Sequence, residues 1–446
     1  WGGCMSGYKF SDFLIKVQEK NRILLYNVLL RSYAETNVDE LRRLQAALNG
    51  ANEEFLLSTF VDRGIVLENH INEYALFKYI SNKIKYDRSV LSITDVITLN
   101  CNLNCIYCMQ QGIKPHNKER NGSLSPQDRV NLWLALMDLF DTKTIAVTFF
   151  GGEPSLYPEK LSEIIRIAEK EQVPIKQYNI ITNGVSFSNH MFEVLSNSKF
   201  RFIQITIDGP KNIHDKRRIS QNYDGTWEVI IDNINKLLNK TNLTIVIHTV
   251  LDRMNSEEKY GMMIDELIDI FGKNTIKERF LFNIGLLSHP NSSCAYTIEN
   301  IPDIAEYANI YVNTIKVALE RDIFLLDFLN IWPCTYHKET DLVVAPNGDL
   351  YNCISGVGRE EFRICSYSEF LNSPIDFLRR YSQFMENDNT DNECKDCIYL
   401  PICNGGCRFN AYILKTKKDC WKVFHQNSYP ELLRLFSKFR ERVKLV

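Results

Sequence analysis

The chain has 446 residues, of which 45% are hydrophobic and 24% are charged, and its formal net charge is −3. This composition is typical of a soluble globular protein, and the length predicts roughly two to three domains. The weak net charge gives no reason to expect nucleic acid as a partner. No apolar run approaches the roughly 20 residues of a membrane span, and the chain shows no secretory signal, so we expect a cytoplasmic protein without a membrane partner.

Residues 1–90 are predicted to form a small α+β module. Two strand-like runs, "YKFSDFLIKV" and "RILLYNVLL", precede a helical pattern in "VDELRRLQAALN". A second helix, a short strand in "RGIVLE" and a third helix in "NEYALFKYISNKI" follow. This order suits a winged-helix-like module, which can bind a peptide by adding a strand to its sheet edge. A simple cap on the next domain is the alternative.

Residues 91–290 alternate between strand-like and helical patterns. The apolar strand-like runs are "ITDVITL", "IAVTFF", "YNIIT", "RFIQITI", "LTIVIHTV" and "RFLFNIGL". Near-continuous apolar strands between helices indicate a parallel sheet with both faces covered. Six such units predict an α/β fold built on a partial (β/α)6 barrel, in which chemistry takes place at the carboxyl ends of the strands.

The remainder of the chain divides into three predicted segments. We interpret 291–330 as a linker or bridging region and 331–425 as a loop-rich domain, with turns such as "APNGDLYNC" and dense cysteines. A segment with little core of its own needs metal or covalent crosslinks. Residues 426–446 are predicted to form an amphipathic C-terminal helix that packs against the body of the protein.

Ten of the 13 cysteines fall into two groups, three at 101–108 and seven of the eight between 334 and 420, with Cys365 left outside the second group. Because the chain is large and has no secretory signal, we interpret them as reduced metal ligands rather than disulfides. In "CNLNCIYC", three thiolates fit three corners of a four-iron, four-sulfur cluster and leave one iron open. Zinc is the alternative metal for a three-cysteine loop.

The first group resembles the signature of the radical S-adenosylmethionine (SAM) superfamily, Cys-x3-Cys-x-aromatic-Cys. Its matching residues are Cys101, Cys105, Tyr107 and Cys108. In that family the open iron chelates the amino and carboxylate groups of SAM, whose reductive cleavage gives a 5′-deoxyadenosyl radical. The resemblance therefore implies a SAM-binding [4Fe-4S] cluster on this loop.

Three further segments resemble parts of the same family. In "FFGGEP", Gly151 and Gly152 would let the cofactor approach the backbone, and Glu153 would accept hydrogen bonds from its ammonium group. The segments "ITNG" and "ITIDGPKNIHDKRR" resemble those that close the third and fourth strands. By resemblance, Thr206 lies near the cofactor and Arg218 faces its carboxylate. A solvated charge cluster is the alternative for Arg218, and His214 is expected to be a structural hydrogen-bonding residue.

The second cysteine group matches the seven-cysteine SPASM pattern of radical enzymes that modify peptides and proteins. The resemblance implies two auxiliary [4Fe-4S] clusters, and so three clusters in all. One would be held by Cys394, Cys397, Cys403 and Cys420, and the other by Cys334, Cys353 and Cys407. A zinc ribbon is the alternative for 394–407 alone. Relatives with eight cysteines carry one before the position of Cys334, where this chain has none; Cys294 or, less favourably, Cys365 would have to replace it. We favour a second open iron.

Two positions depart from the pattern of sulfatase-maturing relatives. Those enzymes carry Asp directly after the second SPASM cysteine and Gln directly before the GGEP glycines, where this chain has Ile354 and Phe150. The carboxylate expected for oxidising a sulfatase residue is therefore missing from its usual place. A sulfatase maturase, or a quinone-cofactor maturase, is accordingly a weaker prediction.

The sequence thus predicts a radical SAM/SPASM peptide maturase that acts on a ribosomally made precursor. The N-terminal module would bind the leader of the precursor, and a small redox protein of flavodoxin or ferredoxin type would donate electrons. An open auxiliary iron favours a thioether crosslink between a cysteine sulfur and a carbon. The alternatives are carbon–carbon crosslinking, epimerisation, and a non-catalytic peptide-binding protein with structural metal sites.

Overall fold

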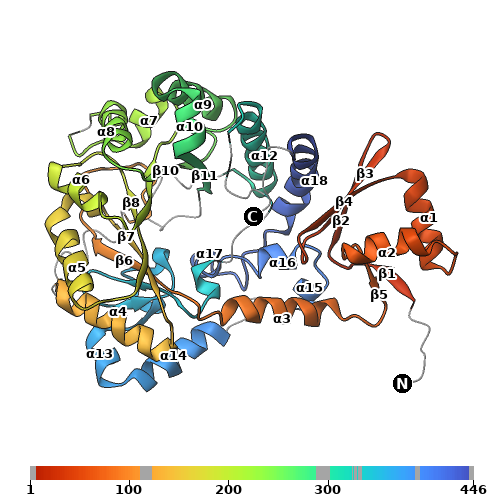
Figure 1. Cartoon of the computed structure of the whole chain (residues 1–446), viewed down its shortest axis with the longest axis horizontal. Helices are drawn as coiled ribbons and strands as arrows, with labels where there is room; N and C mark the ends of the chain where they lie inside the picture. The colour runs from red at the N-terminus through yellow and green to blue at the C-terminus, as the bar shows by residue number, and fades with distance from the viewer. Residues whose placement is uncertain are drawn as a thin grey trace.

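The computed structural model describes residues 7–110, 123–222, 224–287, 302–323, 325, 329, 334–386 and 392–440. Figure 1 shows a large α/β body and, beside it, a smaller N-terminal module, with helix α3 (Glu73–Lys85) running between them. Within the described parts of the chain, no helix combines the length and apolar character that crossing a bilayer requires.

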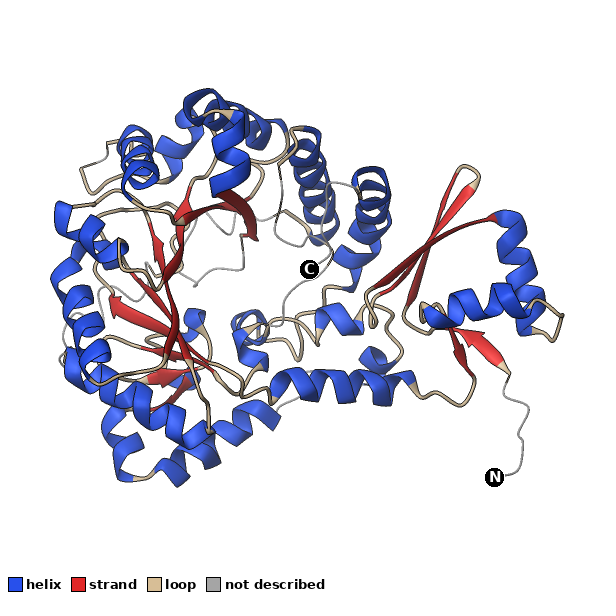
Figure 2. Ribbon diagram, viewed as in Figure 1, coloured by secondary structure: helices blue, strands red, loops and turns tan. Residues whose placement is uncertain are grey.

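The body is built on a sheet of nine strands in the order β11-β10-β9-β8-β7-β6-β12-β13-β14. The first six in this order pair only in parallel. They are β6 (Leu91–Thr98), β7 (Ile145–Gly151), β8 (Ile175–Thr182), β9 (Phe200–Thr206), β10 (Thr244–Leu251) and β11 (Phe280–Leu286). The predicted α/β class and largely parallel sheet are confirmed, and the curved arrangement of strands is consistent with a partial barrel (Figure 2).

Helices cover the outer face of this sheet. They are α4 (Pro126–Phe140), α5 (Pro158–Lys170), α6 (Asn189–Leu195), α7 (Lys211–Arg217), α8 (Trp227–Lys240), α9 (Glu258–Phe271) and α10 (Lys273–Arg279). Ser125 caps α4 by accepting a hydrogen bond from the Asp128 amide at 3.0 Å, which explains why this helix begins at Pro126. Alternate strand residues such as Val147 and Phe149 are fully buried beneath the helices. The intervening positions point to the inside of the barrel.

A buried ion pair ties α4 to β6. The Arg129 guanidinium bonds to the Asp95 carboxylate, and both side chains are fully buried. Arg129 also donates to the backbone carbonyl of Pro346 at 3.0 Å. A helix, a barrel strand and the cysteine-rich region are therefore held together by one side chain.

The cysteine-rich region shares the sheet of the barrel. Strand β12 (Asp341–Val344) lies parallel to β6, with Asp341 opposite Ser92, and β13 (Leu350–Tyr351) and β14 (Arg363–Cys365) extend the sheet antiparallel. The rest of this region forms short helices: α13 (Tyr367–Asn372), α14 (Pro374–Glu386), α15 (Asn392–Lys395), α16 (Leu400–Cys403) and α17 (Arg408–Leu414). The region predicted over 331–425 is thus loop-rich, but part of it continues the central sheet.

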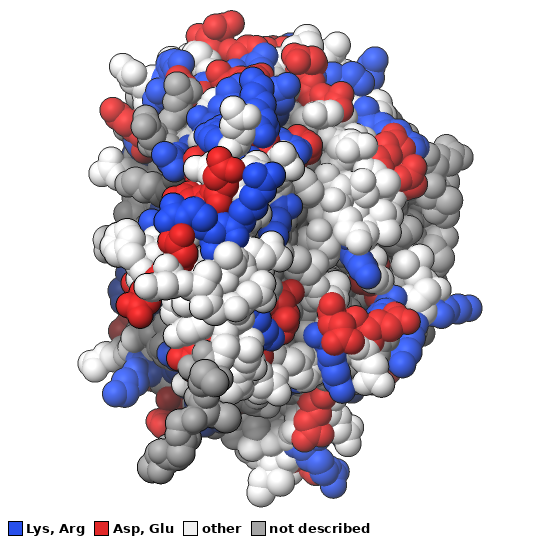
Figure 3. Space-filling view, turned by 90° about the vertical axis from the view of Figure 1, so that its right-hand side faces the viewer, with Lys and Arg blue, Asp and Glu red and all other residues white. Residues whose placement is uncertain are grey.

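The N-terminal module has the predicted mixture of strands and helices. Its strands are β1 (Tyr8–Phe10), β2 (Leu14–Glu19), β3 (Arg22–Asn27), β4 (Ser32–Asn37) and β5 (Val66–Glu68), and its helices are α1 (Val38–Leu48) and α2 (Glu54–Asp62). Strands β2, β3 and β4 form an antiparallel sheet, and β1 pairs with β5. Figure 3 looks onto the side of the molecule where this module lies and shows acidic and basic side chains interspersed.

Two helices join the module to the body. Helix α12 (Ile304–Glu320) lies within the segment predicted as a linker, and Asp303 caps it. Helix α18 (Lys422–Phe439) packs against α12 and against β2 and β3. Apolar side chains of the sheet, including Phe13 and Tyr26, share one cluster with Leu433 and Phe436 of α18. The predicted C-terminal helix therefore packs on the body, and it begins four residues earlier than expected.

Candidate active site

The three-cysteine loop follows β6 at the carboxyl end of the parallel sheet. Two backbone hydrogen bonds fasten it to the end of α7 and the residues just after it: the Ile106 amide donates to the Arg217 carbonyl at 3.0 Å, and the Asn104 amide donates to the Ile219 carbonyl at 2.8 Å. Cys105 is buried, while Cys101 and Cys108 are partly exposed. Burial and the neighbouring Cys108 and Cys101 thiols raise the pKa of Cys105 to about 12, against the opposing effect of Arg218. The three thiols are therefore close enough to influence one another.

Gly151 and Gly152 allow the end of β7 to lie against the chain that leads into this loop. A Cβ atom on Gly151 would lie 2.3 Å from the Thr98 carbonyl oxygen, and one on Gly152 would lie 2.2 Å from that of Asn100. The amide of Gly152 donates to Thr98 at 2.8 Å. Glycine is therefore required at both positions because the two backbone segments lie so close together. This is a second reason for the glycines, besides the predicted approach of a cofactor.

The Glu153 carboxylate is fully buried and already holds three donors. It accepts hydrogen bonds from the Thr182 hydroxyl at 2.6 Å, the Asn183 amide at 2.6 Å and the Ser155 amide at 2.9 Å. Burial raises the pKa of Glu153, and these hydrogen bonds oppose that shift. Glu153 therefore fixes the end of β8 beside the cysteine loop, whereas its predicted contact with a cofactor ammonium group stays a prediction.

The cysteine loop, the glycines and Glu153 surround one cavity of about 330 Å³. All the residues predicted to contact SAM or to hold its cluster line this cavity: Cys101, Cys105, Tyr107, Cys108, Gly151, Gly152, Glu153, Thr206 and Arg218. The chain brings them together from segments at or after the ends of β6, β7 and β9. No sequence motif indicates the apolar part of the wall, which includes Val250 and Leu287 at the ends of β10 and β11. The rule that chemistry gathers at strand ends would have indicated both.

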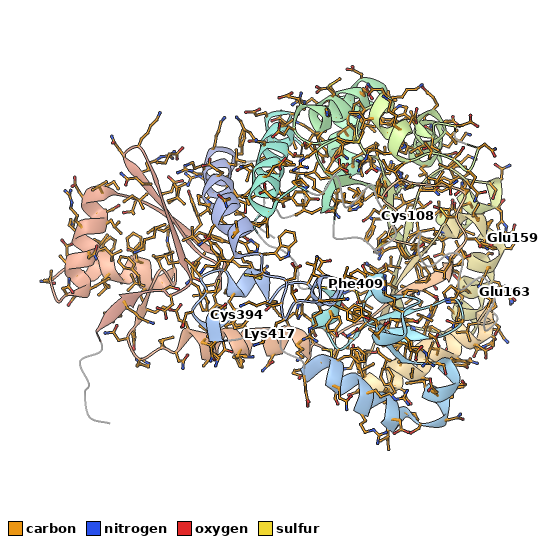
Figure 4. The ribbon with its side chains drawn as sticks, turned by 180° about the vertical axis from the view of Figure 1, so that it is seen from behind. Cys108, Glu159, Glu163, Cys394, Phe409 and Lys417 are labelled. Carbon is orange, nitrogen blue, oxygen red and sulfur yellow. The ribbon has the colours of Figure 1, made fainter. Side chains whose placement is uncertain are left out.

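Two residues of the cysteine-rich region complete the wall. Ser355 and Phe409 line the cavity, and each lies two residues after a predicted cluster ligand, Cys353 and Cys407 respectively. Figure 4, which labels Phe409, shows it between Cys108 and Cys394. No sequence signal marks either residue, because only the folded chain brings the two regions together.

A buried network of charges supports the side of the cavity formed by Arg218. The Arg218 guanidinium donates to the Tyr107 hydroxyl at 2.7 Å, and this hydroxyl donates to the Asp208 carboxylate. Arg217 stacks on the Tyr107 ring with 4.9 Å between the guanidinium carbon and the ring centroid, and pairs with Asp252 at 2.6 Å. Burial acts to raise the pKa of Asp208, but Arg217 and Arg218 lower it. Asp208 is therefore ionised.

The donor set of the cavity fits SAM and a cluster. The Arg218 Nε atom is buried and has no hydrogen-bond partner among the described residues, so this cation can receive an anionic group. Three thiols lie together beside it. His214, in contrast, is occupied: Nδ1 accepts from the Asp208 amide at 3.2 Å and Nε2 lies 3.1 Å from the Thr226 hydroxyl. It has the structural role that the sequence predicts.

The second cysteine group divides into two neighbourhoods. Burial, Cys334 and Cys407 raise the pKa of Cys353 to about 12. Burial, Cys420 and Cys397 raise the pKa of Cys403 to about 11. Cys394 adjoins the second neighbourhood, because the Cys397 amide donates to its carbonyl at 3.1 Å. This placement agrees with the two predicted ligand sets, although their binding of clusters stays a prediction.

Two other observations bear on the metal sites. Among the described residues, no three Cys, His, Asp or Glu side chains gather tightly enough to hold a single metal ion. A four-iron cluster holds each thiolate on a different iron, so its ligands need not meet at one point. Cys365 is 2% exposed within β14 and packs in the main core, with Glu369 and Arg363 as its charged neighbours. Cys294 lies outside the described residues.

Several known proteins resemble this chain in sequence. A family model described as the Radical SAM superfamily matches residues 96–265. The cysteine-type anaerobic sulfatase-maturating enzyme of Clostridium novyi (strain NT) is 25% identical over 70% of this chain and 86% of its own length. The radical SAM cyclopropyl synthase TigE of Paramaledivibacter caminithermalis is 22% identical over 79% of this chain and 76% of its own.

Solved structures share the fold. Native anSMEcpe with bound AdoMet has a TM-score of 0.56 at 18% identity, covering 78% of this chain and 99% of its own. Streptococcus suis SuiB bound to S-adenosylmethionine has a TM-score of 0.52 at 17% identity and covers 92% of this chain and 98% of its own. SuiB has also been solved bound to its precursor peptide SuiA, with a TM-score of 0.53.

Proposed function

Because the chain is a radical SAM enzyme of the SPASM family, we propose that it is a maturase that crosslinks a ribosomally synthesised precursor peptide. The observation that carries this proposal is the composition of the cavity wall. The cysteine loop and Arg218 occupy one part of it, and Phe409 and Ser355 of the cysteine-rich region occupy another. A substrate in this cavity would lie between a SAM site and an auxiliary cluster.

The residues of the cavity have distinct roles in this proposal. Cys101, Cys105 and Cys108 would hold the SAM-binding cluster, and Arg218 would receive the cofactor carboxylate. Bound SAM would supply a 5′-deoxyadenosyl radical that removes a hydrogen atom from the substrate. The apolar wall that includes Phe150, Val250 and Leu287 would limit the access of water to this reaction.

A thioether is the bond that we favour. Cys334, Cys353 and Cys407 would hold an auxiliary cluster with three protein ligands, and a substrate thiolate would occupy its fourth iron. The position of Ser355 and Phe409, two residues after Cys353 and Cys407, supports this because it sets the ligands close to the cavity. The other four SPASM cysteines would hold a third cluster, through which electrons pass to or from a flavodoxin- or ferredoxin-type protein.

The N-terminal module would bind the leader of the precursor. Coverage by the solved structures supports this part of the proposal. The match to anSMEcpe includes 99% of that chain but 78% of this one, so part of this chain has no counterpart there. SuiB, which has been solved bound to a precursor peptide, covers 92% of this chain. The three-stranded sheet of β2, β3 and β4 offers edges to which an extended peptide can add.

A sulfatase maturase is the second candidate, because the Clostridium novyi relative is named as a sulfatase-maturating enzyme. Phe150 lines the cavity where such enzymes carry Gln, and Ile354, in place of their Asp, lies beside Ser355. Neither side chain can accept a proton. Carbon–carbon bond formation is a third candidate, supported by the likeness to the cyclopropyl synthase TigE.

The test is anaerobic turnover of the reconstituted protein with SAM, a reductant and the peptide encoded by the neighbouring short reading frame. We expect the peptide to lose two hydrogens by mass spectrometry and one cysteine to become resistant to alkylation. A sulfatase-derived cysteine peptide serves as the competing substrate. Loss of two hydrogens with every cysteine still alkylated would exclude the thioether, and turnover of the sulfatase peptide alone would favour the second candidate.

A further inference from the structure

Arg408 directly follows Cys407, a predicted ligand of the auxiliary cluster with three cysteines. Its guanidinium lies over the ring of Tyr336, with 4.3 Å between the guanidinium carbon and the ring centroid. It also donates to the backbone carbonyl of Phe384 at 2.5 Å. Its Nε atom is buried and has no hydrogen-bond partner among the described residues. The planar group is therefore held in place on one side while one of its donors stays unused.

Tyr336 connects Arg408 with the other two predicted ligands of this cluster. It lies two residues after Cys334 in the chain. Tyr336 and Cys353 are both buried and belong to one apolar cluster of side chains. Cys353 in turn has the thiols of Cys334 and Cys407 as neighbours. The guanidinium of Arg408 therefore lies beside the group of three thiols, next to one of them in the chain and on a side chain that packs with another.

The contacts of Arg408 within the described part of the chain include no carboxylate. Three other arginines of the body that are buried or half-buried each pair with an aspartate: Arg129 with Asp95, Arg217 with Asp252 and Arg363 with Asp349. Taking a cation out of water is costly unless an opposite charge compensates it. A four-iron cluster with three thiolate ligands is anionic, and its reduction makes it more so. Such a group beside Cys407 would supply the charge that Arg408 lacks.

We propose that the charge of Arg408 stabilises the reduced form of the cluster held by Cys334, Cys353 and Cys407, and so raises its reduction potential. This inference rests on the proposed function, which makes these three thiols cluster ligands. In the proposed crosslinking step, the substrate carbon radical and the substrate thiolate form one S–C bond, and the one electron left over passes to the auxiliary cluster. The thiol proton has already left when the thiolate forms. A cation beside the cluster favours this electron transfer.

The test is a redox titration of the anaerobically reconstituted full-length protein, followed by electron paramagnetic resonance. Arg408→Gln removes the charge but keeps an amide donor for the Phe384 carbonyl. We expect it to make the reduction of one cluster about tenfold less favourable, which lowers its midpoint potential by about 59 mV for one electron. The other clusters should keep their potentials. Arg408→Lys keeps the charge, so its equilibrium for reduction should stay within about twofold of the parent's.

Arg166→Gln is the matched control, because it removes the same charge from an exposed position on α5, and it should leave every potential unchanged. An unchanged potential in Arg408→Gln, or an equal fall in Arg408→Lys, would overturn the role of the charge. Loss of this cluster's iron in both Arg408 variants would make the residue structural and would also overturn the proposal. A parent protein that holds only about four irons per chain would instead refute the proposed function, because it would have no auxiliary cluster.

Discussion

The Arg218 guanidinium and the Tyr107 hydroxyl are joined by a 2.7 Å hydrogen bond, although the two residues lie 111 positions apart in the chain. Tyr107 belongs to the cysteine loop, and Arg218 directly follows the last residue of α7. This bond and the one from Tyr107 to Asp208 set the direction of the cation that faces the cavity. The aromatic residue of the motif therefore contributes through its hydroxyl as well as its ring.

Tyr107→Phe should accordingly weaken SAM binding about tenfold, because hydrogen bonds to charged groups contribute about 1.5–3 kcal/mol. The ring remains to stack with Arg217, so the iron content of the protein should be unchanged. Equilibrium dialysis with SAM checks this. Tyr412→Phe removes an exposed hydroxyl that bonds Glu361 and is the control. Equal affinity in the two variants would show that Arg218 is held without Tyr107.

Replacing Cys101, Cys105 and Cys108 together by Ala should abolish reductive SAM cleavage. If each cluster has four irons, the iron content should fall from about 12 to about 8 per chain, with sulfide falling in parallel. The control is Cys365→Ala, which removes a core thiol outside both predicted ligand sets. A loss of iron in that control would make Cys365 a ligand, and surviving cleavage in the triple variant would contradict the assignment of the loop.

The Asp95–Arg129 pair should be essential for stability but not for chemistry. Arg129→Met leaves a buried carboxylate without its partner and should lower the free energy of unfolding by about 3–5 kcal/mol, whereas Asp95→Leu combined with Arg129→Met should recover most of this loss. Anaerobic urea denaturation measures both. Arg42→Met, at an exposed pair with Asp39, should cost less than about 1 kcal/mol. A double variant as unstable as the single one would contradict this account.

Mild acid should destabilise the protein through its buried histidines. Burial lowers the pKa of His425 to about 4, below the value of about 6.5 in an unfolded chain. Between these values the unfolded state binds more protons, so stability is lost as the pH falls from 7.5 to 5.5, by about 1 kcal/mol for this residue. His425→Phe keeps the aromatic packing between Tyr399 and Tyr429 and should reduce the pH dependence of the urea midpoint. His190→Gln should leave it unchanged, and an unaltered slope in His425→Phe would contradict the prediction.

The barrel strands and the cavity residues could both be predicted from the sequence, because both follow from a parallel sheet that is covered on its two faces. Strands buried on both faces must be apolar along their length, and the motifs that follow them meet at one edge because the strands are parallel. The order of strands and motifs along the chain is therefore enough to place Cys101, Gly151 and Arg218 together.

Other features could not be predicted because they depend on contacts distant in sequence. The pairing of β12 with β6 joins segments about 250 residues apart, and no local pattern specifies a strand's partner. Phe409 and Ser355 belong to the region that this pairing joins to the barrel, and they line the cavity only in the folded chain. Helix α12 is a different case: Asp303 and the apolar repeat after it are ordinary helix signals, which the linker interpretation overlooked.

The position of α18 has a consequence for the assembly of the molecule. This helix separates the N-terminal sheet from α12 and contributes side chains to the apolar cluster shared by all three. During synthesis the sheet of β2, β3 and β4 is made long before α18, so the inner face that includes Phe13 and Tyr26 stays uncovered while the barrel is being translated. The module can dock only when almost all of the described chain has been made, which couples the placement of the module to completion of the α/β body.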